Sequence, residues 1–170
     1  MEQKGHIKKY KIGVVGAGHV GLVAAACFAE LGHRVICVDN DAGKINSLKK
    51  LIMPFYEPEL EPLVRKNIKK GILTFSSSLD ETIKAAQVIF IAVGTPPQPD
   101  GSADLTAIEN VAQAVARNLD SYKIVIEKST VPVQTGQKVK ETILTLIKTS
   151  IHCATKEFLK DNGINHYCTI

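Results

Sequence analysis

A glycine-rich turn between an apolar strand and an apolar helix most constrains how this chain can fold. The turn spans residues 16–21 with the sequence GAGHVG, and the apolar segment that follows the helix ends at Asp39. Glycines at this spacing are typical of a βαβ unit that binds a dinucleotide. In such a unit Gly16 permits a tight turn, Gly18 lets the backbone approach a pyrophosphate, and Gly21 lets the helix pack closely. The free N–H groups and positive end of the helix face the anion.

Asp39 predicts which dinucleotide binds. It follows Gly21 by 18 residues, near the spacing at which a carboxylate accepts hydrogen bonds from the adenosine ribose and repels a 2′-phosphate. No arginine occurs in residues 40–43, so the sequence favours NAD over NADP. Lys44, in the first turn of the next predicted helix, is within reach of the same ribose. The alternatives are a strand-end turn residue at Asp39 and a solvated lysine at Lys44.

The rest of the chain alternates predicted strands and helices, which indicates a parallel α/β sheet. Predicted strands lie at about 12–15, 35–38, 73–75, 88–93 and 123–126, and predicted helices at about 19–31, 42–51, 59–70, 78–86, 104–119 and 136–147. We expect a doubly wound, mostly parallel sheet of the Rossmann NAD-binding fold, with strand order 3-2-1-4-5-6. The expected domains are a loose leader at 1–9, a dinucleotide-binding domain at 10–148, and a divergent tail at 149–170 with a short sixth strand at 151–154.

The predicted strand order brings three loops to one edge of the sheet. Gly94 and Thr95 follow the fourth strand beside the glycine turn, and Thr130 follows the strand after it. The two threonine hydroxyls could contact ribose, phosphate or nicotinamide, or could instead cap the helices that come next.

Apolar residues recur at helical spacing in the first predicted helix. The stripe predicted to face the sheet consists of Val20, Val23, Ala24, Cys27, Phe28 and Leu31. Cys27 and Cys37 both fall in apolar periodic segments, so we expect them to be small core residues.

Composition argues against several classes of function. The net charge is +4, from 21 Lys and Arg against 17 Asp and Glu, and no aromatic residues interleave with the basic ones, so we expect no nucleic-acid partner. No apolar stretch approaches a membrane span and the N-terminus lacks a signal-peptide core, so we expect no membrane partner. Four cysteines without CxxC spacing fit the cytoplasm, and we expect no metal site because His and Cys residues do not stand at ligand spacing.

Five segments resemble motifs of the UDP-glucose/GDP-mannose dehydrogenase family. They read GVVGAGHVGL (13–22), VDNDAGKI (38–45), YEPEL (56–60), AVGTPPQPDGSADL (92–105) and EKSTVPVQTG (127–136), and together they cover about residues 11–136. The resemblance implies a two-step, NAD-dependent oxidation of the C6 alcohol of a nucleotide sugar to a carboxylate, with UDP-glucose the expected sugar nucleotide.

The resemblance also implies roles for individual residues. Asp39 and Lys44 match adenosine-ribose contacts. Val20 matches the turn residue over the pyrophosphate, where we expect His19 to contribute its backbone while its side chain points away. Gly94, Thr95 and Thr130 match the segments that lie toward the nicotinamide half.

The tail departs from the family pattern. Glu157 matches a family carboxylate that assists water or proton transfer near the substrate, but the Asn-Pro pair that precedes it in the family is Thr155-Lys156 here. The family's nucleophilic cysteine, in its glycine-rich motif, has no counterpart in the chain. We therefore expect NAD binding without turnover, and a homodimer or self-association through exposed apolar surface. The alternatives are a stand-alone NAD-binding or regulatory module, or part of a GDP-mannose or other nucleotide-sugar dehydrogenase.

Overall fold

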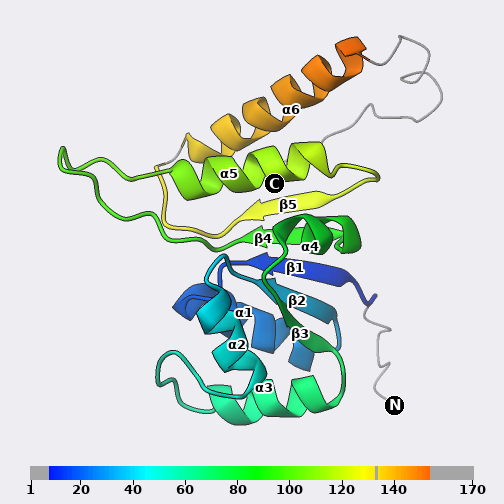
Figure 1. The fold of residues 1–170 in the computed structure, drawn as a ribbon, viewed down its shortest axis with the longest axis vertical. Coiled ribbons are helices and arrows are strands. Elements are labelled where there is room, and N and C mark those ends of the chain that lie inside the picture. Colours follow the sequence, from blue (N-terminus) through cyan, green and yellow to red (C-terminus); the bar gives the residue numbers. More distant parts are fainter. Residues whose placement is uncertain (1–7, 133, 154–170) are drawn as a thin grey trace, which may run out of the picture.

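A computed structural model describes residues 8–132 and 134–153 of the chain. In this part, five parallel strands form one sheet in the order β3-β2-β1-β4-β5 (Figure 1), which confirms the order predicted for the first five strands. The strands are β1 (Lys11–Val15), β2 (Arg34–Val38), β3 (Leu73–Ser76), β4 (Val88–Ile91) and β5 (Ile124–Glu127).

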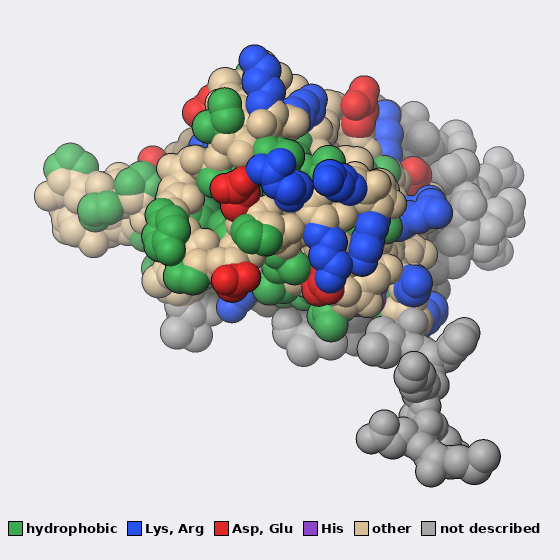
Figure 2. All heavy atoms as spheres, turned by 90° about the horizontal axis from the view of Figure 1, so that it is seen from below, with side chains coloured by type: hydrophobic (Ala, Val, Ile, Leu, Met, Phe, Trp, Pro, Cys, Tyr) green, Lys and Arg blue, Asp and Glu red, His purple; other side chains and the backbone are tan. Residues whose placement is uncertain are grey.

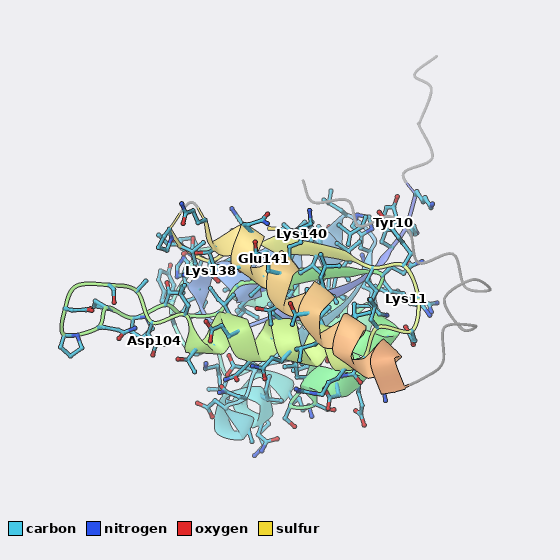
Figure 3. All side chains as sticks on the ribbon, turned by 90° about the horizontal axis from the view of Figure 1, so that it is seen from above. Tyr10, Lys11, Asp104, Lys138, Lys140 and Glu141 are labelled. Carbon is cyan, nitrogen blue, oxygen red and sulfur yellow. The ribbon has the colours of Figure 1, made fainter. Side chains whose placement is uncertain are left out.

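Six helices connect and cover the strands. They are α1 (His19–Glu30), α2 (Ala42–Lys49), α3 (Leu60–Lys69), α4 (Leu79–Ala85), α5 (Thr106–Arg117) and α6 (Thr135–Cys153). Helices α1 and α3 pack on one face of the sheet around one core cluster, whereas α4, α5 and α6 surround a second cluster on the other face. Helix α6 lies along α5 on the outside of the molecule (Figures 1 and 3), with Lys138 and Glu141 exposed.

The switch point of the sheet lies between β1 and β4, where the chain winds in opposite directions. Three backbone hydrogen bonds join the loops at the carboxyl ends of the strands. Gly16 N–H donates to the Val38 carbonyl at 2.7 Å, and Ala92 N–H donates to the Val15 carbonyl at 2.8 Å. Lys128 N–H donates to the carboxyl end of β4 at 2.8 Å. The three loops predicted to meet therefore do so, at the edge where open α/β sheets bind ligands.

The predicted core stripe of α1 is correct for Val23 and Phe28, which pack against the core, and wrong for Val20, Cys27 and Leu31, which are exposed. The helix buries its small residues and one leucine, namely Gly21, Leu22, Ala25, Ala26 and Ala29. Val20 and Leu31, predicted to be buried, are 50% and 58% exposed. Because α1 is apolar around most of its circumference, periodicity does not fix which face meets the sheet, and the face of small residues allows the closest approach. For the same reason Cys27 is exposed, whereas the prediction of a buried Cys37 is confirmed.

The predicted sixth strand is wrong for residues 151–153, which belong to α6. Isoleucines and valine recur every four residues at Val139, Ile143, Ile147 and Ile151, and this spacing fits a helix better than a strand. Residues 154–170, which include Glu157, and residues 1–7 of the predicted leader lie outside the described residues.

Two features that would change the class of the protein are absent from the described residues. No helix within residues 8–132 and 134–153 combines the length and apolar character needed to cross a membrane. Within the same residues, His, Cys, Asp and Glu side chains do not gather in threes as a metal site would require.

Candidate functional site

The glycine turn joins β1 to α1 and leaves its backbone open at the middle. Gly16 has a φ of +104°, and a Cβ there would collide with the carbonyl oxygen of Ala92, so only glycine fits. A Cβ on Gly21 would collide with the carbonyl oxygen of Gly16. By contrast, no atom lies within 4 Å of the Cβ position of Gly18. The fold thus requires the first and third glycines, whereas the space at Gly18 admits a ligand to the backbone.

The N-terminus of α1 has no internal cap. Gly18 is the N-cap residue, no side chain accepts a hydrogen bond from the first N–H groups, and the first turn contains no acidic residue. These N–H groups can therefore donate to a bound anion, which the positive end of the helix also favours.

Asp39, at the end of β2, lies beneath the glycine turn with only 8% of its surface exposed. Its Oδ2 accepts hydrogen bonds from Ala17 N–H at 2.7 Å and from Lys44 Nζ at 2.9 Å, and its Oδ1 accepts one from Asp41 N–H at 3.0 Å. Burial opposes the charged form, but these donors together outweigh it and hold the pKa of Asp39 below its ordinary value. A carboxylate oxygen can accept two hydrogen bonds, so Oδ1 retains a place for one more donor.

Lys44 lies beside the predicted ribose position, and its ammonium group is bound to Asp39. The Asp41 side chain accepts a hydrogen bond from Lys44 N–H at 2.9 Å and so begins α2. Lys44 is therefore not a freely solvated lysine. A ligand that reaches Asp39 also meets the lysine that neutralises it.

A hydrogen bond joins the two predicted threonines across the loops after β4 and β5. Thr95 Oγ1 donates to the carbonyl oxygen of Thr130 at 2.8 Å. Neither residue caps a helix, because the N-cap of α5 is Leu105 and α6 begins at Thr135. Because the Thr95 hydroxyl donates its proton to the Thr130 carbonyl, its oxygen can still accept a hydrogen bond from a ligand.

Glu127, the last residue of β5, is a titratable residue at the same edge, where the sequence places it without assigning it a contact to the cofactor. Its Oε1 accepts a hydrogen bond from Ser129 N–H at 2.8 Å, while its Oε2 is buried without a partner within the described residues. Burial is the main influence on this carboxyl and raises its pKa. The sequence did hold a signal, because Glu127 ends an apolar strand just as Asp39 does.

The side chain of His19 has a definite partner, which sequence reasoning missed. Its Nε2 lies 3.0 Å from Glu57 Oε2, and its ring stacks on Phe55 with 4.7 Å between ring centroids. Glu57 lies in a loop without periodicity, so no sequence pattern connects it to the glycine turn.

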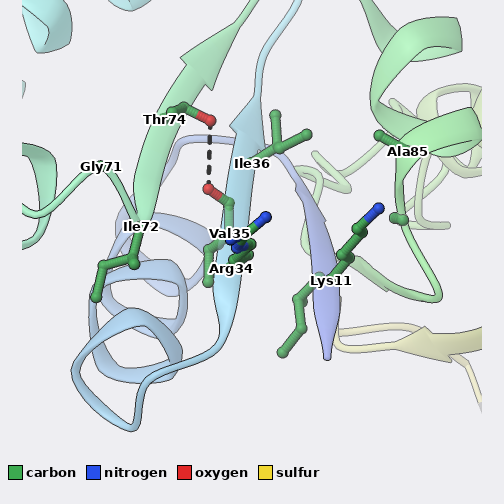
Figure 4. A pocket seen from close by; sticks show the side chains of 10 residues that line it. Lys11, Arg34, Val35, Ile36, Gly71, Ile72, Thr74 and Ala85 are labelled. Atoms are coloured by element: carbon green, nitrogen blue, oxygen red, sulfur yellow. Dashed lines mark hydrogen bonds between the residues drawn. The ribbon is translucent and has the colours of Figure 1, made fainter. Parts of the chain in front are cut away.

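A cavity of about 230 Å³ opens at the opposite edge of the sheet, near the amino ends of β1, β2 and β3 (Figure 4). Lys11, Arg34, Ile36 and Thr74 contribute to its lining. None of the predicted site residues lines this cavity, so it is separate from the candidate site.

Lys and Arg side chains gather on the face of the molecule seen in Figure 2, viewed from the side of α3. Two basic residues of α3 have acidic partners: Arg65 lies 2.6 Å from Glu61, and Lys66 lies 2.5 Å from Glu30. This pairing is typical of a solvated charged surface, and the predicted site residues are not part of it.

Residues 10–167 match the UDP-glucose/GDP-mannose dehydrogenase family, NAD binding domain. The chain belongs to this family. Among relatives, it is 42% identical over 159 residues to the UDP-glucose 6-dehydrogenase TuaD of Bacillus subtilis, covering 92% of this chain and 34% of that protein. It is 48% identical over 134 residues to a UDP-glucose 6-dehydrogenase of Rhizobium meliloti, covering 78% of this chain and 31% of that one.

Solved structures of this dehydrogenase family show the same fold. A UDP-glucose dehydrogenase from Pyrobaculum islandicum superposes with a TM-score of 0.79 at 37% identity, over 86% of this chain and 35% of that one. A GDP-mannose dehydrogenase from Pseudomonas aeruginosa gives a TM-score of 0.74 at 32% identity, over 81% of this chain and 32% of that one. The chain therefore spans about a third of the length of the relatives it matches.

These matches confirm the resemblance, the Rossmann fold and NAD as the cofactor of this domain. The residues present also fit a dinucleotide. Gly18 offers open backbone at an uncapped helix N-terminus, and Asp39 offers a charged acceptor next to it.

Proposed function

We propose that this chain binds one NAD across the carboxyl edge of its sheet. The pyrophosphate lies on the N–H groups at Gly18 and the start of α1, and the adenosine ribose donates to Asp39. The nicotinamide half extends toward Gly94, Thr95 and Thr130. The observation that carries the proposal is the 2.7 Å hydrogen bond from Ala17 N–H to Asp39, because it holds the acid against the anion-binding turn.

Each residue has a distinct task in this arrangement. The backbone at Gly18, His19 and Val20 orients the pyrophosphate without adding a charge of its own. Asp39 selects NAD by accepting from the ribose, while the Asp41 and Ala17 N–H groups together with Lys44 keep the carboxylate ionised and in place. When bound, NAD supplies the acceptor for a hydride from the alcohol carbon of the substrate.

We further propose that the activity of the full-length protein is nucleotide-sugar 6-dehydrogenation. In that reaction a C6 alcohol becomes a carboxylate, two NAD each accept one hydride, and water supplies the second carboxylate oxygen. UDP-glucose is the favoured substrate, because the relatives named for it are 42% and 48% identical to this chain, against 32% for the GDP-mannose enzyme. Glu157 is proposed to assist proton transfer by its match to the family motif.

Neither of the cysteines whose side chains the structure describes, Cys27 and Cys37, stands in the glycine-rich motif that holds the family's nucleophile. Burial raises the pKa of the Cys37 thiol to about 12, so this residue stays protonated. Cys27 lies exposed on α1, a helix that packs against β1, β2 and β3. We therefore propose that the chain binds NAD without turning over by itself. Both thiols are free, as expected of a protein in the cytoplasm.

Two measurements on the purified chain test these proposals. Isothermal titration calorimetry with NAD is expected to show saturable binding with one site per chain. Absorbance at the NADH band, with NAD and UDP-glucose present, is expected to stay flat. Absence of NAD binding by the folded chain would overturn the first proposal, and steady NADH production would overturn the second.

A further inference from the structure

The segment between α2 and α3, residues 52–58, bends at Pro54 and Phe55, and we call it the strap. Burial alternates along it: Met53, Phe55 and Glu57 are partly buried, whereas Ile52 and Tyr56 are exposed. Met53 and Phe55 pack against the core cluster that contains α1. The strap is therefore docked on the protein through every second residue, Met53, Phe55 and Glu57.

His19 joins the strap to the glycine turn. It is the first residue of α1 and follows Gly18 directly. Its Nε2 lies 3.0 Å from Glu57 Oε2, and its ring stacks on Phe55 at an interplanar angle of 26°. When the imidazole is protonated, the contact is an ion pair, and charge attraction to the Glu57 carboxylate adds to the stacking on Phe55.

Left-handed backbone brackets the strap at both ends. Leu51 has a φ of 62° and Glu59 a φ of 64°, and no other non-glycine residue within 8–132 and 134–153 has a positive φ. After Leu51, Ile52 N–H donates to the Ser47 carbonyl at 2.9 Å, which ends α2. Such conformations persist only where the surroundings enforce them, so the strap leaves α2 and enters α3 in fixed directions.

Hydrogen bonds from their backbone N–H groups hold Gly16 and Ala17 of the glycine turn, whereas Gly18 is the more open part of it. Nothing lies within 4 Å of the Cβ position of Gly18, and no side chain caps α1. Glycine loses more conformational freedom on ordering than any other residue, and a turn that is ordered before binding saves that entropy when the ligand arrives. A contact that immobilises His19 also restrains the N–H groups next to Gly18.

From these contacts, and resting on the proposed NAD site, we propose that His19 and Glu57 are positioning residues for the cofactor. Through the strap they hold the glycine turn in the conformation whose N–H groups receive the pyrophosphate. Neither side chain is assigned a direct contact with the dinucleotide.

Three variants isolate this contact. His19→Phe keeps a ring to stack on Phe55 but removes the imidazole nitrogen that faces Glu57. Glu57→Ala removes the carboxylate, and the double variant removes both partners of the ion pair. Glu61→Ala is the matched control, because it deletes an exposed carboxylate that pairs with Arg65 on α3 at 2.6 Å.

Hydrogen exchange without NAD and calorimetry with NAD give the two readouts. Each single variant should speed amide exchange in residues 16–21 and 52–58 and weaken NAD by about two- to fivefold, the range expected for one exposed ion pair. The double variant should equal the singles, because all three lose the same contact. Glu61→Ala should behave as wild type in both measurements.

Several results would overturn the inference. Faster strap exchange with unchanged NAD affinity would make the contact structural only. Additive losses in the double variant would mean that His19 and Glu57 act separately. Either result leaves the proposed function intact, whereas failure of the wild-type chain to bind NAD would remove the proposed function and this inference together.

Discussion

Replacing Asp39 by asparagine keeps the shape of the side chain and removes its charge. The carboxylate accepts hydrogen bonds from Ala17 N–H, Asp41 N–H and Lys44 Nζ. An amide has a single acceptor oxygen, so at least one of these donors would face an NH₂ group. We expect Asp39→Asn to destabilise the fold and to weaken NAD, by two separable mechanisms.

The size of the binding effect follows from the ribose hydrogen bond. A hydrogen bond to a charged group contributes about 1.5–3 kcal/mol, which corresponds to roughly 10- to 150-fold in the dissociation constant of NAD. The variant also loses the charge that repels a 2′-phosphate, and it frees the Lys44 ammonium to meet one. The ratio of NAD to NADP affinity should therefore fall by more than the NAD affinity does.

The stability of Asp39→Asn has a defined pH dependence. The pKa of Asp39 is lowered in the folded state, so its carboxylate stabilises the fold fully above its unfolded pKa of about 3.9. That contribution disappears as the pH falls through the lower, folded-state pKa. Urea denaturation should therefore show the largest difference between wild type and variant above about pH 5, and a shrinking one below about pH 4.

Calorimetry with NAD and with NADP tests the assignment. Asp41→Asn is the matched control, because it removes an equal charge two residues away while asparagine still caps α2. The ribose assignment is refuted if Asp39→Asn binds NAD within about twofold of wild type, or if Asp41→Asn weakens NAD equally.

The remaining predictions concern the turn, a helix cap and a buried acid. Gly16→Ala should unfold at a clearly lower urea concentration than wild type, because the added Cβ would collide with the Ala92 carbonyl. Gly18→Ala should keep wild-type stability and lose NAD binding in calorimetry. The reverse pattern would contradict the roles assigned to the two glycines. Ser78→Ala should cost about 1 kcal/mol in urea denaturation through loss of the α4 cap, and Ser77→Ala, exposed and outside the cap, should cost little. The stability of Glu127→Gln relative to wild type, measured by urea denaturation, should be greater at pH 7 than at pH 4. A carboxyl whose pKa is raised in the folded state contributes less to the stability of wild type as the pH rises through its titration. Equal differences in stability at both pH values would refute this.

Patterns over short stretches of sequence were enough to predict the strand order and much of the candidate site. The glycine turn, Asp39 and the alternation of strands and helices predicted the strand order, because right-handed crossovers leave few ways to arrange parallel strands. That order placed Thr95 near Thr130, and the structure joins them by a hydrogen bond. The helix predicted at residues 42–51 also forms, as α2 (Ala42–Lys49), because its apolar residues recur at helical spacing.

The failures share a different cause. The burial phase of α1 depends on which face fits the sheet, and an almost uniformly apolar helix does not specify that face. The pairing of Lys44 with Asp39 and of His19 with Glu57 depends on side-chain placement across loops. Spacing along the chain predicts neither of these pairs, because both depend on how the folded backbone brings the loops together.

The central claim is that NAD lies across the carboxyl edge of the sheet, and chemical-shift mapping with ¹⁵N-labelled chain tests it most directly. On addition of NAD we predict saturable shifts at residues 16–21, at Asp39 and Lys44, and at residues 94–95 and 129–130. The cavity lined by Lys11, Arg34 and Thr74 should stay unaffected. Shifts confined to that cavity, or none at NAD concentrations that saturate related dehydrogenases, would contradict the account.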